Sequence, residues 1–337
     1  MEAIISQVHQ GVGLILLNRP AAINALTGQM IHDLTTLLSD WAVDPGVERV
    51  VVSGVGRGFC AGADVRQLRL DLLQGHDGVE FLEQEYRLDQ LIATYPKPYA
   101  SCLHGVVMGG GMGISIHGSQ RLVRAGTTLA MPETIIGLWP DVGMTYWLSR
   151  LPGEIGTFMA LTGLGVSAAQ AVSVGLADRW WTPDADVSAL SPTQMLDLLV
   201  AEVESGRGHH PRGDQPPEGT IPADQWMESA FSGDDPIAIM SRLADSAIPA
   251  ASAAASAIMA RSPVSVVVTL AALRRARTMT LPQVFDQDLR LGRFFLARPD
   301  FVEGVRAQLV DRDHRPHWSI SALSAVPRGI VDEAFSS

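Results

Sequence analysis

Two hydrophobic patterns alternate along the first third of the chain. Short apolar runs, bounded by turn residues such as Gly11, have the length of β-strands. They cover residues 3–8, 12–17, 50–52 and 98–103. Other segments repeat apolar residues at helical spacing, and Thr27 stands at the N-cap position before the first of them. These predicted helices cover residues 28–42, 65–73 and 79–94. The alternation predicts an α/β fold with βαβ units and a mostly parallel sheet.

The pattern changes after about residue 180. Residues 248–261 and 264–277 have helical spacing, and residues 205–222 are rich in glycine, proline, histidine and charge, as exposed flexible loops are. We therefore expect a core over residues 1–180 that carries the functional sites. Residues 181–337 are expected to form a mainly helical C-terminal region with a flexible loop near 205–222.

Composition narrows the class of protein. Hydrophobic residues make up 47% of the 337 residues and charged residues 18%, enough for a buried core. The net charge of −11 argues against a nucleic-acid partner, and no apolar stretch is long enough to predict a membrane span. The N-terminus lacks the zones of a signal peptide, and two cysteines provide no disulfide framework. These features predict a cytoplasmic globular protein.

Two glycine-bearing loops are the strongest candidates for chemistry. Residues 59–64 (FCAGAD) follow a predicted strand, and residues 108–113 (MGGGMG) lie where a strand gives way to a helix. Glycine allows close backbone approach, and free N–H groups at a helix start suit an oxygen anion. Tight helix–strand packing is the alternative explanation for a lone glycine triplet. Neither loop has the spacing of a dinucleotide or phosphate-binding motif.

Both loops resemble the oxyanion loops of the crotonase (enoyl-CoA hydratase/isomerase) superfamily, the second over residues 104–111 (HGVVMGGG). The resemblance implies a crotonase-like ββα spiral core. It also implies that the backbone N–H groups of Ala63 and Gly110 bind a thioester oxygen, where one donor contributes about 3 kcal/mol. Ala61, Gly62 and Asp64 would then lie along the adenine of the CoA substrate.

The acidic residues that follow select among the reactions of the superfamily. Its hydratases keep a catalytic glutamate two residues after the glycine triplet, and that position is Gly113 here. Glu133 matches their second glutamate, and Asp141 follows eight residues later. The segment MPETIIGLWPDVG, residues 131–143, resembles the 3-hydroxyisobutyryl-CoA hydrolase branch, in which the Glu and the Asp are the catalytic pair.

Thioester hydrolysis requires an activated water or a carboxylate nucleophile, and a proton for the leaving thiolate. Two neighbouring buried carboxyls tend to separate in pKa, so that one is ionised while the other holds a proton. We expect Glu133 to be the base or nucleophile. Asp141 is expected to orient the reacting groups or to protonate the leaving thiolate. The structural alternatives are a helix-start acid for Glu133 and an N-cap for Asp141.

Further residues gain candidate roles from the resemblance. Glu85 falls where the branch keeps another acid at the substrate end of the site, although a solvated charge on a helix face is an equal alternative. Trp139, between the two catalytic candidates, is expected near the acyl pocket. Arg19, Arg57 and Arg312 are candidate contacts of the CoA phosphates.

No His/Cys cluster has ligand spacing, so we expect neither a metal nor a cofactor, coenzyme A being part of the substrate. His104 and His117 are expected to be structural or surface residues and Cys60 a packing residue. Near the end of the chain, residues 301–307 and 311–318 resemble the C-terminal signature of the hydrolase branch.

The predicted reaction is hydrolysis of a short branched 3-hydroxyacyl-CoA, expected to be 3-hydroxyisobutyryl-CoA, to the free acid and CoA in valine breakdown. An enoyl-CoA hydratase or isomerase and a non-catalytic CoA-thioester-binding protein remain alternatives. The exact acyl group, and the choice between an anhydride intermediate and direct attack by water, stay open. The superfamily suggests a homo-oligomer, with a trimer as its common form.

Overall fold

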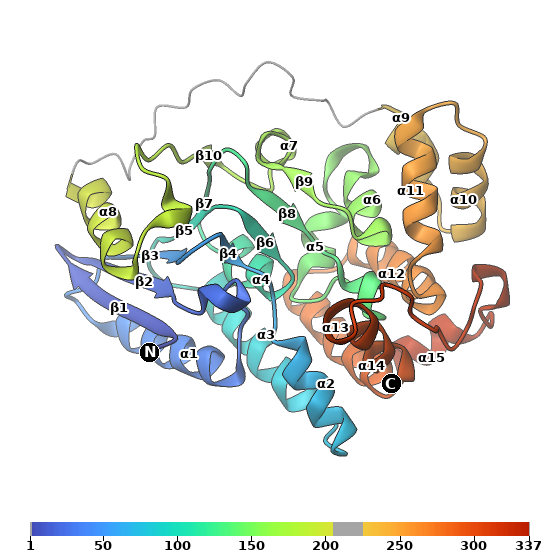
Figure 1. Cartoon of the computed structure of the whole chain (residues 1–337), viewed down its shortest axis with the longest axis horizontal. Coiled ribbons are helices and arrows are strands. Elements are labelled where there is room, and N and C mark those ends of the chain that lie inside the picture. Colours follow the sequence, from blue (N-terminus) through green and yellow to red (C-terminus); the bar gives the residue numbers. More distant parts are fainter. Residues whose placement is uncertain (1, 205–224, 337) are drawn as a thin grey trace. The chain divides into compact units, whose positions relative to one another are not determined.

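The computed structural model describes residues 2–204 and 225–336 (Figure 1). The loop predicted near 205–222 lies outside them. The chain forms two compact units that interleave in sequence. The first contains the described residues of Met1–Ala63, Arg87–Leu129 and Val166–Ile221, and the second those of Asp64–Tyr86, Ala130–Gly165 and Pro222–Ser337. The boundary expected near residue 180 stays a prediction.

A six-stranded sheet forms the centre of the first unit, in the order β1-β2-β3-β5-β7-β10. Its strands are β1 (Ile4–His9), β2 (Val12–Leu17), β3 (Arg49–Gly54), β5 (Tyr99–Leu103), β7 (Gln120–Val123) and β10 (Arg179–Trp180). β1 and β2 form an antiparallel hairpin, and every following pair in the sheet is parallel. All six residues of β2 are buried, which explains its uninterrupted apolar run. The predicted, mostly parallel sheet is confirmed.

A smaller sheet has the order β4-β6-β8-β9. Its strands are β4 (Gly58–Cys60), β6 (Val106–Met108), β8 (Thr128–Ala130) and β9 (Val166–Ser167). β4 and β6 pair in parallel and lead into the two glycine-bearing loops. Pairing between these two strands therefore brings the loops into the same part of the first unit.

Helix α1 shows how the main sheet of the first unit is covered. Thr27 caps the helix as predicted, because its Oγ1 accepts the Met30 N–H at 3.2 Å. Trp41 near the other end packs over β2, where a Cβ on Gly13 would lie 2.4 Å from its ring. The helical elements of this unit are η1 (Pro20–Ala22), α1 (Gly28–Val43), the last part of α3 (Val79–Ala93), α4 (Gly110–Ile116), α7 (Ala168–Val174), η4 (Val187–Ala189) and α8 (Pro192–Glu204).

The second unit is mainly helical. Before its C-terminal segment it contains α2 (Val65–Leu73), the first part of α3 (Val79–Ala93), η2 (Glu133–Ile136), α5 (Met144–Leu148), η3 (Pro152–Glu154) and α6 (Ile155–Thr162). Its C-terminal elements are α9 (Gln225–Phe231), α10 (Pro236–Ala244), α11 (Pro249–Met259), α12 (Pro263–Ala276), α13 (Leu281–Leu296), α14 (Pro299–Val305), η6 (Arg306–Val310), η7 (Leu323–Ala325) and α15 (Ile330–Ser336). Within the described ranges, every regular element after β10 is a helix or helical turn, as predicted.

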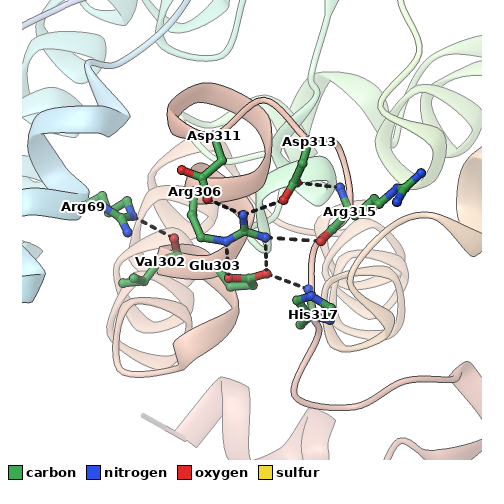
Figure 2. Close-up of polar contacts among 8 residues, drawn as sticks. All are labelled: Arg69, Val302, Glu303, Arg306, Asp311, Asp313, Arg315 and His317. Carbon is green, nitrogen blue, oxygen red and sulfur yellow. Dashed lines mark hydrogen bonds and ion pairs between the residues drawn. The ribbon is translucent and has the colours of Figure 1, made fainter.

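A cluster of charges around Arg306 fixes the turn that follows α14 (Figure 2). The Arg306 guanidinium donates to both oxygens of Glu303 at 2.8 Å, to Asp311 at 2.6 Å and to Asp313 at 2.7 Å. It also donates to the Arg315 carbonyl at 3.2 Å. One planar side chain thus joins the end of α14 to the segment 311–315.

Helix α2 is tied to the same region by two arginines. Arg66 donates to the Leu309 carbonyl at 2.5 Å, and Arg69 donates to the Val302 carbonyl at 3.0 Å. Val302 lies on α14 and Leu309 on η6, so the two contacts join α2 to both of these elements. Arg69 thus joins the signature segment 301–307 to α2, and Arg306 joins the same segment to residues 311–315.

Among the residues that the structure describes, no single helix is long and apolar enough to cross a bilayer. Helices α11 and α12 together have the length and apolar composition of a membrane span, but the chain bends by 114° between them.

Candidate active site

The two glycine-bearing loops touch each other in the first unit. A Cβ added to Gly62 would lie 3.2 Å from the Met108 carbonyl oxygen and 3.4 Å from the Gly110 nitrogen. Gly62 also has φ +106°, a conformation that side chains rarely adopt. A glycine is therefore required at this point for the loops to meet.

Backbone conformation accounts for one of the three consecutive glycines in the second loop, and close packing accounts for another. Gly109 caps α4 with φ 51° and ψ −126°, and a Cβ on Gly111 would lie 2.5 Å from the Cys60 carbonyl oxygen. Gly110 is different, because its N–H is in the first turn of α4 and has no intrahelical acceptor. Neither this N–H nor that of Ala63 has an acceptor in the described part of the chain. Adjacent loops thus offer two free donors to an oxygen anion.

The early segment around Asn24 supports the first loop. The fully buried Asn24 amide lies 3.0 Å from the carbonyl oxygens of Val55, Gly58 and Phe59. The Ala61 N–H donates to the Ile23 carbonyl at 2.9 Å, so it is not a free donor for a ligand. The segment thus determines the conformation of the first loop.

Three acids come together in the second unit. Glu85 lies on α3, Glu133 begins η2 and Asp141 lies in the loop before α5, with exposed fractions of 1%, 7% and 7%. The alternative of a solvated helix-face charge is therefore wrong for Glu85. The capping alternative is also wrong for Asp141, because Gly143 caps α5 and the Asp141 carboxylate accepts the Tyr86 hydroxyl at 2.8 Å.

Burial and mutual repulsion raise the pKa values of these acids. Desolvation raises the pKa of Asp141 to about 6, partly offset by the Tyr86 hydroxyl and its own backbone N–H. Desolvation raises the pKa of Glu133 and of Glu85 well above the usual range, and the Asp141 charge raises both further. Glu85 Oε1 and Glu133 Oε2 have no hydrogen-bond partner in the described part of the chain. Burial and the neighbouring Asp141 charge thus raise the pKa of both glutamates, and the assignment of the base or nucleophile stays a prediction.

Two residues of this group were not predicted from the sequence. Tyr86 follows Glu85 on α3 and donates to Asp141. Asp288 on α13 is fully buried and accepts the Trp139 indole N–H at 3.0 Å and the Gly143 N–H at 2.9 Å. The sequence did contain a signal for Asp288, which is an acid among the apolar positions of a helix. Acidic side chains are rarely buried unless they have partners, so such a position indicates a specific contact.

The other predicted residues have these positions. Asp64 caps α2 by accepting the Gln67 N–H at 3.4 Å, and Trp139 is fully buried. Arg19 is half-buried and donates to the Ala25 carbonyl, whereas Arg57 and Arg312 are exposed. Their roles at CoA, and that of Trp139 at the acyl group, stay predictions.

The histidines and cysteines of this region have structural surroundings. His104 is buried with its Nε2 2.9 Å from the Gly56 carbonyl oxygen, His117 is also buried, and the Cys60 thiol lies 3.2 Å from the Asn24 carbonyl oxygen. No group of three or more His, Cys, Asp or Glu residues in the described ranges is arranged to hold a metal ion.

Known proteins resemble the chain over almost its whole length. The family model described as enoyl-CoA hydratase/isomerase matches residues 12–335. The chain is 37% identical to the Gallus gallus protein named 3-hydroxyisobutyryl-CoA hydrolase, mitochondrial, covering 98% of this chain and 88% of that protein. It is 34% identical to the Arabidopsis thaliana 3-hydroxyisobutyryl-CoA hydrolase 1, covering 98% and 91%.

A solved structure also matches closely. It is described as a carnitinyl-CoA dehydratase from Mycobacterium thermoresistibile, has a TM-score of 0.89 and 37% identity, and covers 99% of this chain and 96% of its own. This likeness confirms the predicted crotonase-like fold.

Proposed function

The chain belongs to the enoyl-CoA hydratase/isomerase family, and from this premise we propose that it hydrolyses 3-hydroxyisobutyryl-CoA to the free acid and CoA. One observation supports hydrolysis above all. Glu133 and Asp141 form a buried acid pair, each with a pKa raised by burial, while Gly113 occupies the position of the first hydratase glutamate. The names of the Gallus gallus and Arabidopsis thaliana relatives support the acyl group.

The residues suggest how the thioester is cleaved. The Ala63 and Gly110 N–H groups stabilise the negative charge on the carbonyl oxygen as the C–O bond to water forms. The ionised Asp141 accepts the proton of the attacking water, and the neutral Glu133 gives its proton to the departing thiolate. A return of the proton from Asp141 to Glu133 restores the starting state. Direct attack is favoured over an anhydride, because a Glu133 nucleophile would place a second charge beside Asp141.

The buried acid Glu85 is proposed to meet the polar end of the acyl group. Its Oε1 has no partner within the described residues and its pKa is raised by burial, so it can donate a hydrogen bond from its neutral form. No metal or redox cofactor is proposed.

Thiol release from a panel of acyl-CoAs tests this function. Glu133→Gln and Asp141→Asn are each expected to lower kcat about a hundredfold or more, the size of a general acid–base contribution. The exposed Glu80 and Asp286 provide matched controls, and Glu80→Gln and Asp286→Asn should retain full activity.

Hydration of an enoyl-CoA is the second candidate, because the similar solved structure is described as a dehydratase. Loss of enoyl absorbance from crotonyl-CoA measures it in parallel. Rapid hydration without thiol release from 3-hydroxyisobutyryl-CoA would contradict the hydrolase function. Absence of both activities would favour a non-catalytic CoA-thioester-binding protein.

Valine breakdown, a cytoplasmic location and a trimer remain parts of the proposal. The Gallus gallus relative is named mitochondrial, so its name does not support the location. Sedimentation of the purified protein would establish the oligomeric state.

A further inference from the structure

We propose that Asp288 positions Asp141 for catalysis by holding both ends of the Asp141 loop, defined here as residues 139–143. This inference rests on the proposed function, in which Asp141 is the general base. Asp288 is fully buried on α13 and acts through the loop. It is therefore a positioning residue.

The two oxygens of Asp288 bind opposite ends of the loop. Oδ1 accepts the indole N–H of Trp139 at 3.0 Å, and Oδ2 accepts the backbone N–H of Gly143 at 2.9 Å. Asp141 lies midway between these two residues in sequence. A single carboxyl group thus bridges the loop across its central residue, with one donor for each oxygen.

The second contact lies where the loop backbone is strained. Val142 has φ 49°, which is rare for a β-branched residue, and Gly143 has φ 73°. The Gly143 N–H belongs to the peptide that joins these two residues. A hydrogen bond from this N–H to the buried Asp288 side chain therefore fixes the loop at its least favourable point.

Helix α13 holds the other end of the loop rigidly. Trp139 stacks on Phe295 with ring centroids 5.2 Å apart and an angle of 13°. A Cβ on Gly292 would lie 3.7 Å from the Trp139 ring and 2.6 Å from Leu82 Cδ1. Asp288, Gly292 and Phe295 lie on one face of the helix, at successive turns. The helix therefore fixes both the indole N–H and the ring plane of Trp139.

Asp288→Asn tests the inference most directly. The amide keeps the shape of the side chain, but it turns one acceptor into a donor that faces an N–H, so one end of the loop is released. We expect kcat to fall about tenfold to a hundredfold while KM changes little, because small displacements of a catalytic group act on the chemical step. Asp286→Asn, at an exposed site on the same helix, should leave both constants unchanged.

A positioning role has a second signature. If Asp288 acts through Asp141, adding Asp288→Asn to Asp141→Asn should cause little further loss. If Asp288 is merely structural, Asp288→Asn should yield less folded protein but an unchanged kcat per folded molecule. In the double variant, the effects of the two substitutions should then be independent. An unchanged kcat or independent effects would overturn the inference and leave the proposed function intact.

Hydrogen exchange at the Gly143 N–H and the Trp139 indole N–H separates this inference from the proposed function. If no acyl-CoA is hydrolysed by the unmodified protein, the proposed function fails and so does the catalytic part of the inference. Faster exchange in Asp288→Asn would still support the contact with the loop, and unchanged exchange would exclude it.

Should Asp288→Asn not fold, Trp139→Phe removes one donor and keeps a ring. It should lower kcat and speed exchange at Gly143, and no change in either would contradict the inference.

Discussion

At the scale of single residues, the pKa of Asp141 depends on a phenol. The Tyr86 hydroxyl donates to Asp141 at 2.8 Å and so lowers the pKa of that carboxyl against the effect of burial. Tyr86→Phe should raise the pKa of Asp141 above its value of about 6. Since the base must be ionised, the acidic limb of the kcat/KM profile should move to higher pH, and activity near that limb should fall several-fold.

A pH–rate profile with the substrate below KM measures this shift. Tyr95→Phe is the matched control, because the Tyr95 hydroxyl donates at 2.8 Å to the Leu38 carbonyl in the first unit. An acidic limb that stays in place in Tyr86→Phe would show that a group other than Asp141 titrates there.

The sequence identified the acids of the site but not the residues that control them. Glu133 and Asp141 stand in one short motif, so their pairing was readable from the chain. Tyr86 lies 55 residues from Asp141, and Asp288 lies 145 residues from Gly143. Their roles arise only from tertiary packing, and so does the order of the pKa values, because burial and hydrogen bonds determine it.

At the scale of elements, long periodic segments were predictable and short ones were not. β2 and α2 have the bounds expected from their apolar patterns. β4 and β6 have three residues each, too few to show a period, and they exist because pairing satisfies their backbone groups. The two glycine-bearing loops could thus be found from the sequence, but the strand pairing that brings them together could not.

The turn after α14 depends on the geometry of one arginine. Arg306→Lys should loosen it, because an ammonium group cannot bind Glu303 with two parallel hydrogen bonds while also bonding Asp311 and Asp313. We expect a lower Tm and faster proteolysis within residues 311–318. Limited proteolysis with mass spectrometry would locate the cleavage. Arg290→Lys, at an exposed position on α13, should match the unmodified protein, and equal cleavage in both variants would contradict this role of Arg306.

At the scale of the whole molecule, buried acids make stability depend on pH. The pKa values of Glu85, Glu133, Asp141 and Asp288 are all raised by burial, so the folded chain binds these protons more tightly than the unfolded chain. Stability from these groups is therefore greatest at low pH and falls as pH rises through their folded pKa values. Glu154 has a lowered pKa and acts in the opposite sense, since its contribution is lost as pH falls below the usual glutamate range.

We therefore expect these buried acids to make the protein less stable as pH rises through their folded pKa values. For Asp141 the shift from 3.8 to about 6 corresponds to about 3 kcal/mol at neutral pH. Asp141→Asn removes this charge but keeps an oxygen that can accept the Tyr86 hydroxyl. Denaturant titrations should find the variant more stable than the unmodified chain at about pH 7.5, by up to about 3 kcal/mol, and nearly equal at about pH 4. The same variant should lose hydrolysis, because an ionised base in a buried site trades stability for activity. Equal or lower stability of the variant at neutral pH would show that the Asp141 charge is not a cost to the fold.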